Sequence, residues 1–203
     1  MDPQRPGLAD NEVAAAVLAG GAASRMNGGK AGAILGTRPL AEYPVEALRQ
    51  AGLAPFLVTK NDRPVSIAGV ETVIEPARPR HPLLGIATAL RAASGSSVLI
   101  VACDLPLLPP TMLAWMADQQ GPSLIPRVNG QLQPLAALYR PESLEVIEAG
   151  LRRNRSVKST VLDLDPVVIE ETELSRFGDP EISFHNVNAP ADLVWAEQHL
   201  ASR

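Results

Sequence analysis

The chain has 203 residues, of which 46% are hydrophobic and 20% are charged. This balance excludes a disordered chain and suits one domain of ordinary size. Its net charge of -4 argues against general nucleic-acid binding, and its single cysteine excludes an internal disulfide framework.

An apolar run near the N-terminus, residues 13–23, superficially resembles the core of a signal peptide. Three acidic side chains and a single arginine precede it, whereas a signal peptide needs net positive charge. The run is also too short to span a membrane. We therefore predict a cytoplasmic protein with no membrane contact, in which residues 1–12 form a flexible tail and residues 13–203 form one domain.

Strand and helix patterns alternate through the first 120 residues. Continuous apolar runs without alternation are typical of strands that are buried on both faces of a sheet. The predicted strands are 13–18, 56–59, 72–75 and 97–103, and the predicted helices are 43–50, 83–93 and 111–120. This order predicts a mostly parallel sheet covered by helices on both faces.

The pattern changes after residue 121. Asn129-Gly130 lies between apolar segments at 124–128 and 133–139, which is a strong signal for a β-hairpin. The hairpin predicts an antiparallel addition at the edge of the sheet. Helices at 142–153 and 191–199 enclose a further strand at 167–170, and no stretch is long enough to be a linker between two domains.

A glycine-rich loop, LAGGAASRMNGGK at residues 18–30, follows the first strand. Glycines let backbone N–H groups approach phosphate oxygens, and Arg25 and Lys30 supply two cations beside them. The loop is not a P-loop, because Ser24 stands where the first glycine is needed and Ala31 follows the lysine. It lies at the carboxyl end of a parallel strand, where such sheets bind ligands. We therefore predict a phosphate site.

Asp104 directly follows the most apolar strand and is predicted at the same edge of the sheet as the loop. A carboxylate in this place suits Mg²⁺ that is shared with the phosphates of a nucleotide, and Pro106 stiffens the segment after it. The alternative is an aspartate that caps the next helix. Cys103 is expected to be a buried strand residue and not a nucleophile.

Two sets of polar residues in the second half of the chain each have two possible roles. The basic cluster at residues 152–158 could receive an acceptor phosphate or form a solvated helix end. Asn186 and Asn188 could face an acceptor or cap the helix that follows them. The three histidines show no metal-ligand spacing.

Five motifs carry a resemblance that spans residues 13–200: LAGGAASRMNGGK, HPLLGIATAL, VACDLPLL, QPLAALYR and FHNVNAPADL. Together they resemble the molybdenum cofactor guanylyltransferase family, within the wider nucleotidyltransferases. The resemblance implies a Rossmann-like, three-layer α/β/α fold. The first loop and the Asp-x-Pro sequence are features of the superfamily, and the closing Asn-x-Asn-x-Pro-x-Asp-Leu stretch favours the molybdopterin branch.

The resemblance assigns roles to individual positions. The implied nucleotide-binding residues are Leu18, Ala19, Gly20, Gly21, Lys30, Thr59, Asn61, Glu75 and Asp104. Asp104 would bind Mg²⁺, Lys30 would contact the phosphates, and the end of the second strand would approach the base. Lys30, Arg25 and Asp104 are the implied catalytic residues.

The implied reaction transfers GMP from GTP to the terminal phosphate of molybdopterin, with Mg²⁺, and releases pyrophosphate. The resemblance is also compatible with transient contact with proteins that deliver the cofactor or mature molybdoenzymes. Related alternatives are cytidylyl transfer to molybdopterin, guanylyl transfer to phospholactate and nucleotidyl transfer to a sugar phosphate. A non-catalytic nucleotide-binding module is the distant alternative.

This chain departs from the family pattern at several positions. Gly29 stands in place of an aspartate before the loop lysine, and Asn27 in place of a glycine. Pro76 stands in place of an aspartate after the third strand, which leaves Glu75 beside it. His81 replaces the glycine that opens the next helix. The two missing carboxylates leave the base preference open.

Overall fold

The computed structural model describes residues 13–20, 30–60 and 65–200. Several positions named above therefore lie outside the described residues: the predicted tail at 1–12, Gly21, Arg25, Asn27, Gly29 and Asn61. Their predicted roles stay predictions.

The strands of the structure agree closely with the apolar runs. They are β1 (Ala14–Leu18), β2 (Ile34–Leu35), β3 (Arg38–Pro39), β4 (Pro55–Lys60), β5 (Thr72–Glu75), β6 (Val98–Ala102), β7 (Leu124–Val128), β8 (Gln131–Leu132), β9 (Ala136–Tyr139) and β10 (Val167–Ile169). The short hairpin of β2 and β3 has no counterpart in the predicted elements.

The helices include all five that the sequence patterns predict. They are α1 (Glu42–Gln50), α2 (Pro82–Ala92), α3 (Pro110–Asp118), α4 (Ser143–Arg152), α5 (Val157–Leu162), α6 (Glu171–Leu174), α7 (Pro180–Ser183) and α8 (Pro190–Leu200), with a 3-10 helix at Ser175–Phe177. Among them, no helix of the described segments has the length and apolar character needed to cross a membrane.

The main sheet has the strand order β10-β7-β9-β6-β1-β4-β5, and β8 pairs with β7. β1 pairs in parallel with β4 on one side and with β6 on the other, and β5 continues in parallel from β4. β9 runs antiparallel to both β6 and β7. The mostly parallel sheet is confirmed, and its antiparallel pairing begins inside the sheet at β9.

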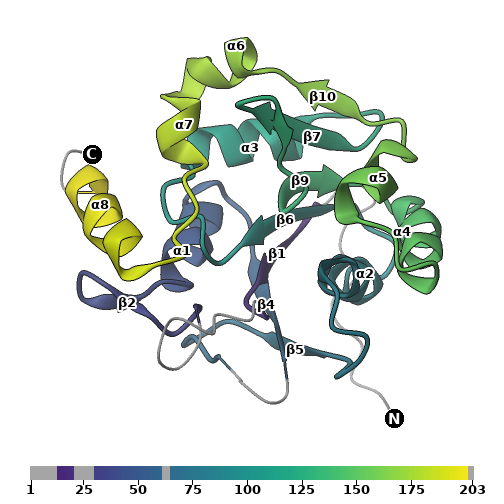
Figure 1. Ribbon diagram of the computed structural model, residues 1–203, viewed down its shortest axis with the longest axis horizontal. Helices are drawn as coiled ribbons and strands as arrows, with labels where there is room; N and C mark the ends of the chain where they lie inside the picture. The colour runs from purple at the N-terminus through teal and green to yellow at the C-terminus, as the bar shows by residue number, and fades with distance from the viewer. Residues whose placement is uncertain (1–12, 21–29, 61–64, 201–203) are drawn as a thin grey trace.

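Two layers of helices cover the sheet, as Figure 1 shows. α1 and α3 pack on one face through a core cluster that includes Val17, Leu57 and Val101. α2, α4 and α5 pack on the other face through a second cluster that includes Ala16 and Ile100. Neighbouring residues of β1 and β6 point to opposite faces, so a strand between two helix layers must be apolar throughout. The three-layer α/β/α fold is confirmed.

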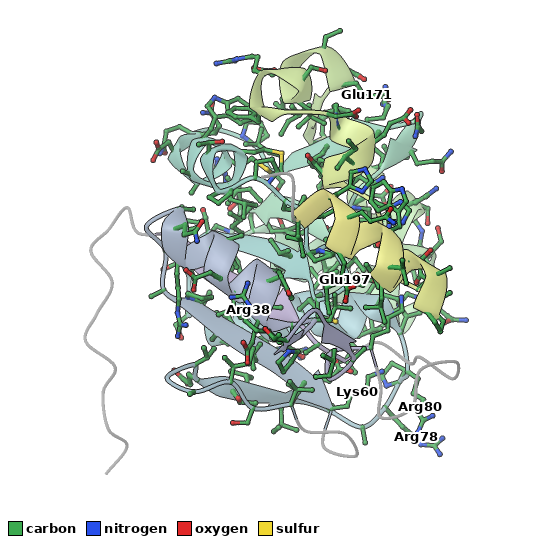
Figure 2. All side chains as sticks on the ribbon, turned by 90° about the vertical axis from the view of Figure 1, so that its left-hand side faces the viewer. Arg38, Lys60, Arg78, Arg80, Glu171 and Glu197 are labelled. Carbon is green, nitrogen blue, oxygen red and sulfur yellow. The ribbon has the colours of Figure 1, made fainter. Side chains whose placement is uncertain are left out.

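A third, smaller core joins the C-terminal helix to the rest of the molecule. Leu35 of β2, Leu107 and Ala196 of α8 are buried together there. Glu197 of α8 accepts a hydrogen bond from the backbone N–H of Gly36 at 2.7 Å, and Figure 2 shows Glu197 at the front of the molecule. The hairpin therefore fixes α8 beside the carboxyl edge of the sheet.

Candidate active site

The end of β1 is held between its two parallel neighbours. The N–H of Ala19 donates to the carbonyl of Val58 at 2.8 Å, and the N–H of Cys103 donates to the carbonyl of Leu18 at 3.1 Å. These bonds carry the pairing of β1 one residue beyond each strand end. Leu18, Ala19 and Gly20 are thus placed at the carboxyl edge of the sheet, where the predicted phosphate loop begins.

Asp104 lies at the same edge, two residues beyond β6. All five residues of β6 are buried, and the N–H of Leu105 donates to the carbonyl of Ala102 at 3.3 Å, which turns the chain. Leu105 and Leu107 are buried after it. This apolar anchoring on both sides presents a carboxylate with 15% of its side-chain surface exposed.

Lys30 meets Asp104 directly. Its Nζ lies 2.7 Å from Asp104 Oδ2, and 17% of the lysine side chain is exposed. The backbone of this region is fixed, because the N–H of Ala33 donates to the Lys30 carbonyl at 3.1 Å and that of Ala41 donates to Ala31 at 3.1 Å. The two residues that the sequence predicted to face one phosphate chain are in contact.

Asn188 joins this pair and had no assigned role in the sequence. Lys30 Nζ donates a hydrogen bond to Asn188 Oδ1, so the ammonium lies between a carboxylate and an amide oxygen. Asn188 therefore lies beside the pair of Lys30 and Asp104, and a role toward an acceptor stays a prediction. The signal was the Asn-x-Asn-x-Pro-x-Asp-Leu stretch itself, although its partner in the fold is 158 residues away in the chain.

Glu75 lies at the end of β5 and forms a second ion pair at the same edge. Its Oε1 is 3.3 Å from Lys60 Nζ, and its side chain is 6% exposed. An added Cβ on Gly20 would lie 3.2 Å from Glu75 Oε1, and one on Gly85 would lie 3.3 Å from Oε2. The absence of side chains at these two glycines makes room for the carboxylate. Sequence reasoning missed Lys60, which precedes Asn61 at a strand end.

Thr59 is fully buried at the end of β4. Its Oγ1 has no hydrogen-bond partner among the described residues, and an unpaired buried hydroxyl is costly. Because β4 side chains alternate, Thr59 lies on the α1 face, whereas Lys60 and Glu75 lie on the α2 face. The structure therefore brings Glu75 to Gly20 and places Thr59 on the other side of the strand.

The segment between β5 and α2 is cationic and lines a cavity. A cavity of about 810 Å³ is lined, among the described residues, by Arg78, Pro79 and Arg80. Figure 2 shows both arginines at the same end of the molecule as Lys60. His81, in place of the family glycine, caps α2 by accepting the N–H of Leu83 at its Nδ1 at 3.2 Å.

The basic cluster at residues 152–158 lies away from this edge. It belongs to α4 and α5, which Figure 1 shows on the side opposite α8. Arg152 pairs with Glu148 at 3.6 Å, Arg155 pairs with Asp163, and Lys158 donates to Gln131. The cluster is a paired surface at helix ends, in keeping with the alternative that does not involve an acceptor.

A divalent cation would have Asp104 as its protein ligand at this edge. The described residues contain no group of three or more histidine, cysteine, aspartate or glutamate side chains suited to a metal. Mg²⁺ commonly binds one or two carboxylates and takes its other oxygens from water and phosphates. A single hard, partly exposed carboxylate fits a metal that is held together with a nucleotide.

Comparison with known proteins shows which family this chain belongs to. Residues 15–167 match the family model of the MobA-like NTP transferase domain. The chain belongs to this family. It is accordingly a nucleotidyltransferase. The match begins within β1 and ends at the first residue of β10, and it includes Lys30, Glu75 and Asp104.

Relatives of similar length extend the likeness over most of the chain. A probable molybdenum cofactor guanylyltransferase from Pelotomaculum thermopropionicum is 32% identical, over 89% of this chain and 89% of that protein. The molybdenum cofactor guanylyltransferase of Rhizobium meliloti is 32% identical, over 92% of this chain and 91% of that protein.

Solved structures share the fold. Molybdopterin-guanine dinucleotide biosynthesis protein A from Archaeoglobus fulgidus superposes with a TM-score of 0.79 at 24% identity, over 94% of this chain and all of that one. 2-C-methyl-D-erythritol 4-phosphate cytidylyltransferase from Thermus thermophilus gives a TM-score of 0.69 at 20% identity, over 95% and 100%. The Rossmann-like nucleotidyltransferase architecture is therefore confirmed.

Proposed function

We propose that this enzyme transfers GMP from GTP to the terminal phosphate of molybdopterin and releases pyrophosphate, with Mg²⁺ as its metal. The observation that carries the proposal is the contact of Lys30 with Asp104 at 2.7 Å, at the joined carboxyl ends of β1 and β6. Guanylyl transfer is the activity in the names of relatives that are 32% identical over about nine tenths of the chain.

The chemistry needs alignment and neutralisation of charge. An oxygen of the acceptor phosphate attacks the α-phosphorus of GTP, the bond from that phosphorus to the bridging oxygen breaks, and pyrophosphate leaves with the electron pair. No covalent enzyme intermediate is needed. Mg²⁺ at Asp104 supplies positive charge to the phosphates when bound. Lys30 supplies a second positive charge to the phosphates. This charge is effective because an ammonium that is already oriented costs no reorganisation during the reaction.

The experiment measures pyrophosphate release with GTP, CTP or ATP in the presence of molybdopterin and Mg²⁺. We expect GTP to be preferred and release to require molybdopterin. Lys30→Met and Asp104→Asn should each lower kcat/KM about 10²–10³-fold, the usual effect of losing one preorganised electrostatic contact. Near-normal turnover in either variant contradicts the proposal.

A matched control comes from another ion pair of similar length. Arg127 Nη1 lies 2.8 Å from Glu170 Oε1 in an exposed pair that joins β7 to the residue after β10. Glu170→Gln also removes one carboxylate charge, and it should leave turnover within about twofold of the unaltered enzyme because exposed pairs contribute little. Preference for CTP would redirect the proposal to cytidylyl transfer. Binding without pyrophosphate release with any acceptor would overturn it in favour of a nucleotide-binding role.

A further inference from the structure

The segment that carries Asn188 runs between α7 and α8 and is fixed at one end by the Asp104 loop. The N–H of Val187 donates to the Asp104 carbonyl at 2.9 Å. Val187 is fully buried in the small core that also contains Leu107. The backbone just before Asn188 is therefore tied to the residue whose carboxylate meets Lys30.

Asp192 fixes the other end of the same segment. Its Oδ2 accepts the backbone N–H of Asn188 at 2.7 Å and that of Ala189 at 2.8 Å. Asp192 lies in the first turn of α8, where a carboxylate also suits the helix dipole. The hydrogen bond from Asn188, and after it the one from Ala189, hold the pKa of Asp192 below its ordinary value, while burial opposes them. Electrostatic interaction with His185 and Lys30 lowers the pKa further.

The second oxygen of the Asp192 carboxylate lies near the His185 ring. Its other oxygen, Oδ1, lies 3.9 Å from His185 Nε2. The His185 ring stacks on Trp195, with ring centroids 4.0 Å apart. One oxygen of Asp192 thus accepts the two backbone N–H groups, while the other lies beside the stacked His185 ring.

We infer that Asp192 is a positioning residue for the nucleotidyl transfer proposed above, on which this inference rests. Asp192 holds the backbone of Asn188, Asn188 Oδ1 accepts from Lys30 Nζ, and Lys30 Nζ contacts Asp104. A lysine side chain has many rotamers, so a fixed acceptor on each side is needed to hold its ammonium in one place. Without Asp192, the amide of Asn188 and the ammonium of Lys30 lose their common orientation.

The test compares three single variants. Asp192→Ala removes both bonds and should lower kcat about 10–100-fold, by analogy with the loss of a partner that orients a metal ligand. Asp192→Asn keeps an oxygen that can accept both N–H groups, so it should stay within a few-fold of the unaltered enzyme. KM for GTP should rise, but by a smaller factor than kcat falls, because Lys30, as proposed, contacts the phosphates of bound GTP and acts most on the charge that develops during transfer.

Glu197→Ala is the matched control. It also removes a carboxylate of α8 that accepts a backbone N–H, at 2.7 Å from Gly36, but this bond does not lead to Lys30. It should lower the melting temperature about as much as Asp192→Ala and leave kcat within about twofold. Equal loss of kcat in both variants would show that Asp192 merely docks α8 and would overturn the inference.

A double variant tests the route through Asn188. If Asp192 acts on Lys30 only by way of Asn188, then the double variant Asn188→Ala with Asp192→Ala should be no slower than Asn188→Ala alone, whereas independent roles give additive losses.

Calorimetric binding of Mg·GTP, Mg·CTP and Mg·ATP distinguishes failure of the proposed function from failure of the positioning role. If the unaltered protein binds a nucleotide but transfers nothing to molybdopterin, the proposed function fails. Weaker binding by Asp192→Ala, and not by Asp192→Asn or Glu197→Ala, would still support the positioning role, while equal binding by all three would overturn it.

Discussion

Cys103 lies next to Asp104 in the chain, and we expect it to take no part in the chemistry of the site. It is 3% exposed. Burial, and after it the charge of Asp104, raise the pKa of its thiol to about 12, against the opposing charge of Lys30. The thiolate is the reactive form of cysteine, so a buried thiol beside a carboxylate is a poor nucleophile.

We predict that the folded enzyme resists alkylation at Cys103. Because the pKa of this thiol is raised well above its ordinary value, very little of it is ionised at pH 8. Mass spectrometry should therefore find no iodoacetamide adduct after a time that fully labels the protein unfolded in guanidinium. Cys103→Ala should keep its kcat within about twofold. Rapid labelling of the folded chain, or loss of turnover in Cys103→Ala, would contradict this account of the site.

Sequence reasoning at the residue scale succeeded where local position decides the outcome. Lys30 ends a glycine-rich loop that follows an apolar strand, and Asp104 directly follows another apolar strand, so their place at one sheet edge could be predicted. Lys60, Asn188 and Asp192 depend on contacts between segments far apart in the chain. Nothing in the local sequence says that Lys60 will meet Glu75, because the register of β4 and β5 decides that pairing.

The elements were predictable where a continuous apolar run or a turn signal marks them. β1, β4, β5 and β6 follow apolar runs, and Asn129-Gly130 forms the turn between β7 and β8. The expected strand at 133–139 is wrong in its first half: β9 begins at Ala136. Pro134 cannot donate to a ladder, and a turn in which the N–H of Ala136 donates to Gln133 at 3.0 Å precedes β9.

The packing of α4 on α5 supplies a prediction at the scale of elements. A Cβ on Gly150 of α4 would lie 2.5 Å from Thr160 Oγ1 and 3.0 Å from Thr160 Cβ. Thr160 is fully buried and its hydroxyl donates to the Ser156 carbonyl at 2.9 Å, so it cannot move away. Gly150→Ala should destabilise the fold by about 1–3 kcal/mol, as overpacking usually does, measured by urea unfolding.

The same crowding predicts a rescue. In a Thr160→Ala background, the two atoms beyond Cβ are gone, so Gly150→Ala should cost less there than in the unaltered chain, and a helix gains from alanine over glycine. Equal costs in the two backgrounds would show that Thr160 is not the obstacle. Turnover should be unaffected, because α4 and α5 lie on the side opposite α8 (Figure 1).

At the scale of the whole molecule, the site is assembled from segments that the chain order separates. β1 lies between β4 and β6, so the ends of three parallel strands meet at one edge. α8, from the end of the chain, is held there by the hairpin of β2 and β3. If a nucleotide binds at this edge, as proposed, it contacts the first and second halves of the fold together, so its binding free energy should stabilise the whole chain.

This linkage gives a prediction that does not need the acceptor. A ligand at 100 times its Kd stabilises the folded state by about 2.7 kcal/mol, which for a chain of this size raises the Tm by about 5–10 °C. Mg·GTP should give such a rise in a thermal melt, and chelation of the metal with EDTA should remove most of it. Asp104→Asn and Lys30→Met should lose the rise at the same nucleotide concentration because they lose the metal ligand and the phosphate contact, whereas Glu170→Gln should keep it. An undiminished rise without metal, or in the Lys30 variant, would mean that the nucleotide binds elsewhere on the molecule and that the pair at the sheet edge has another role.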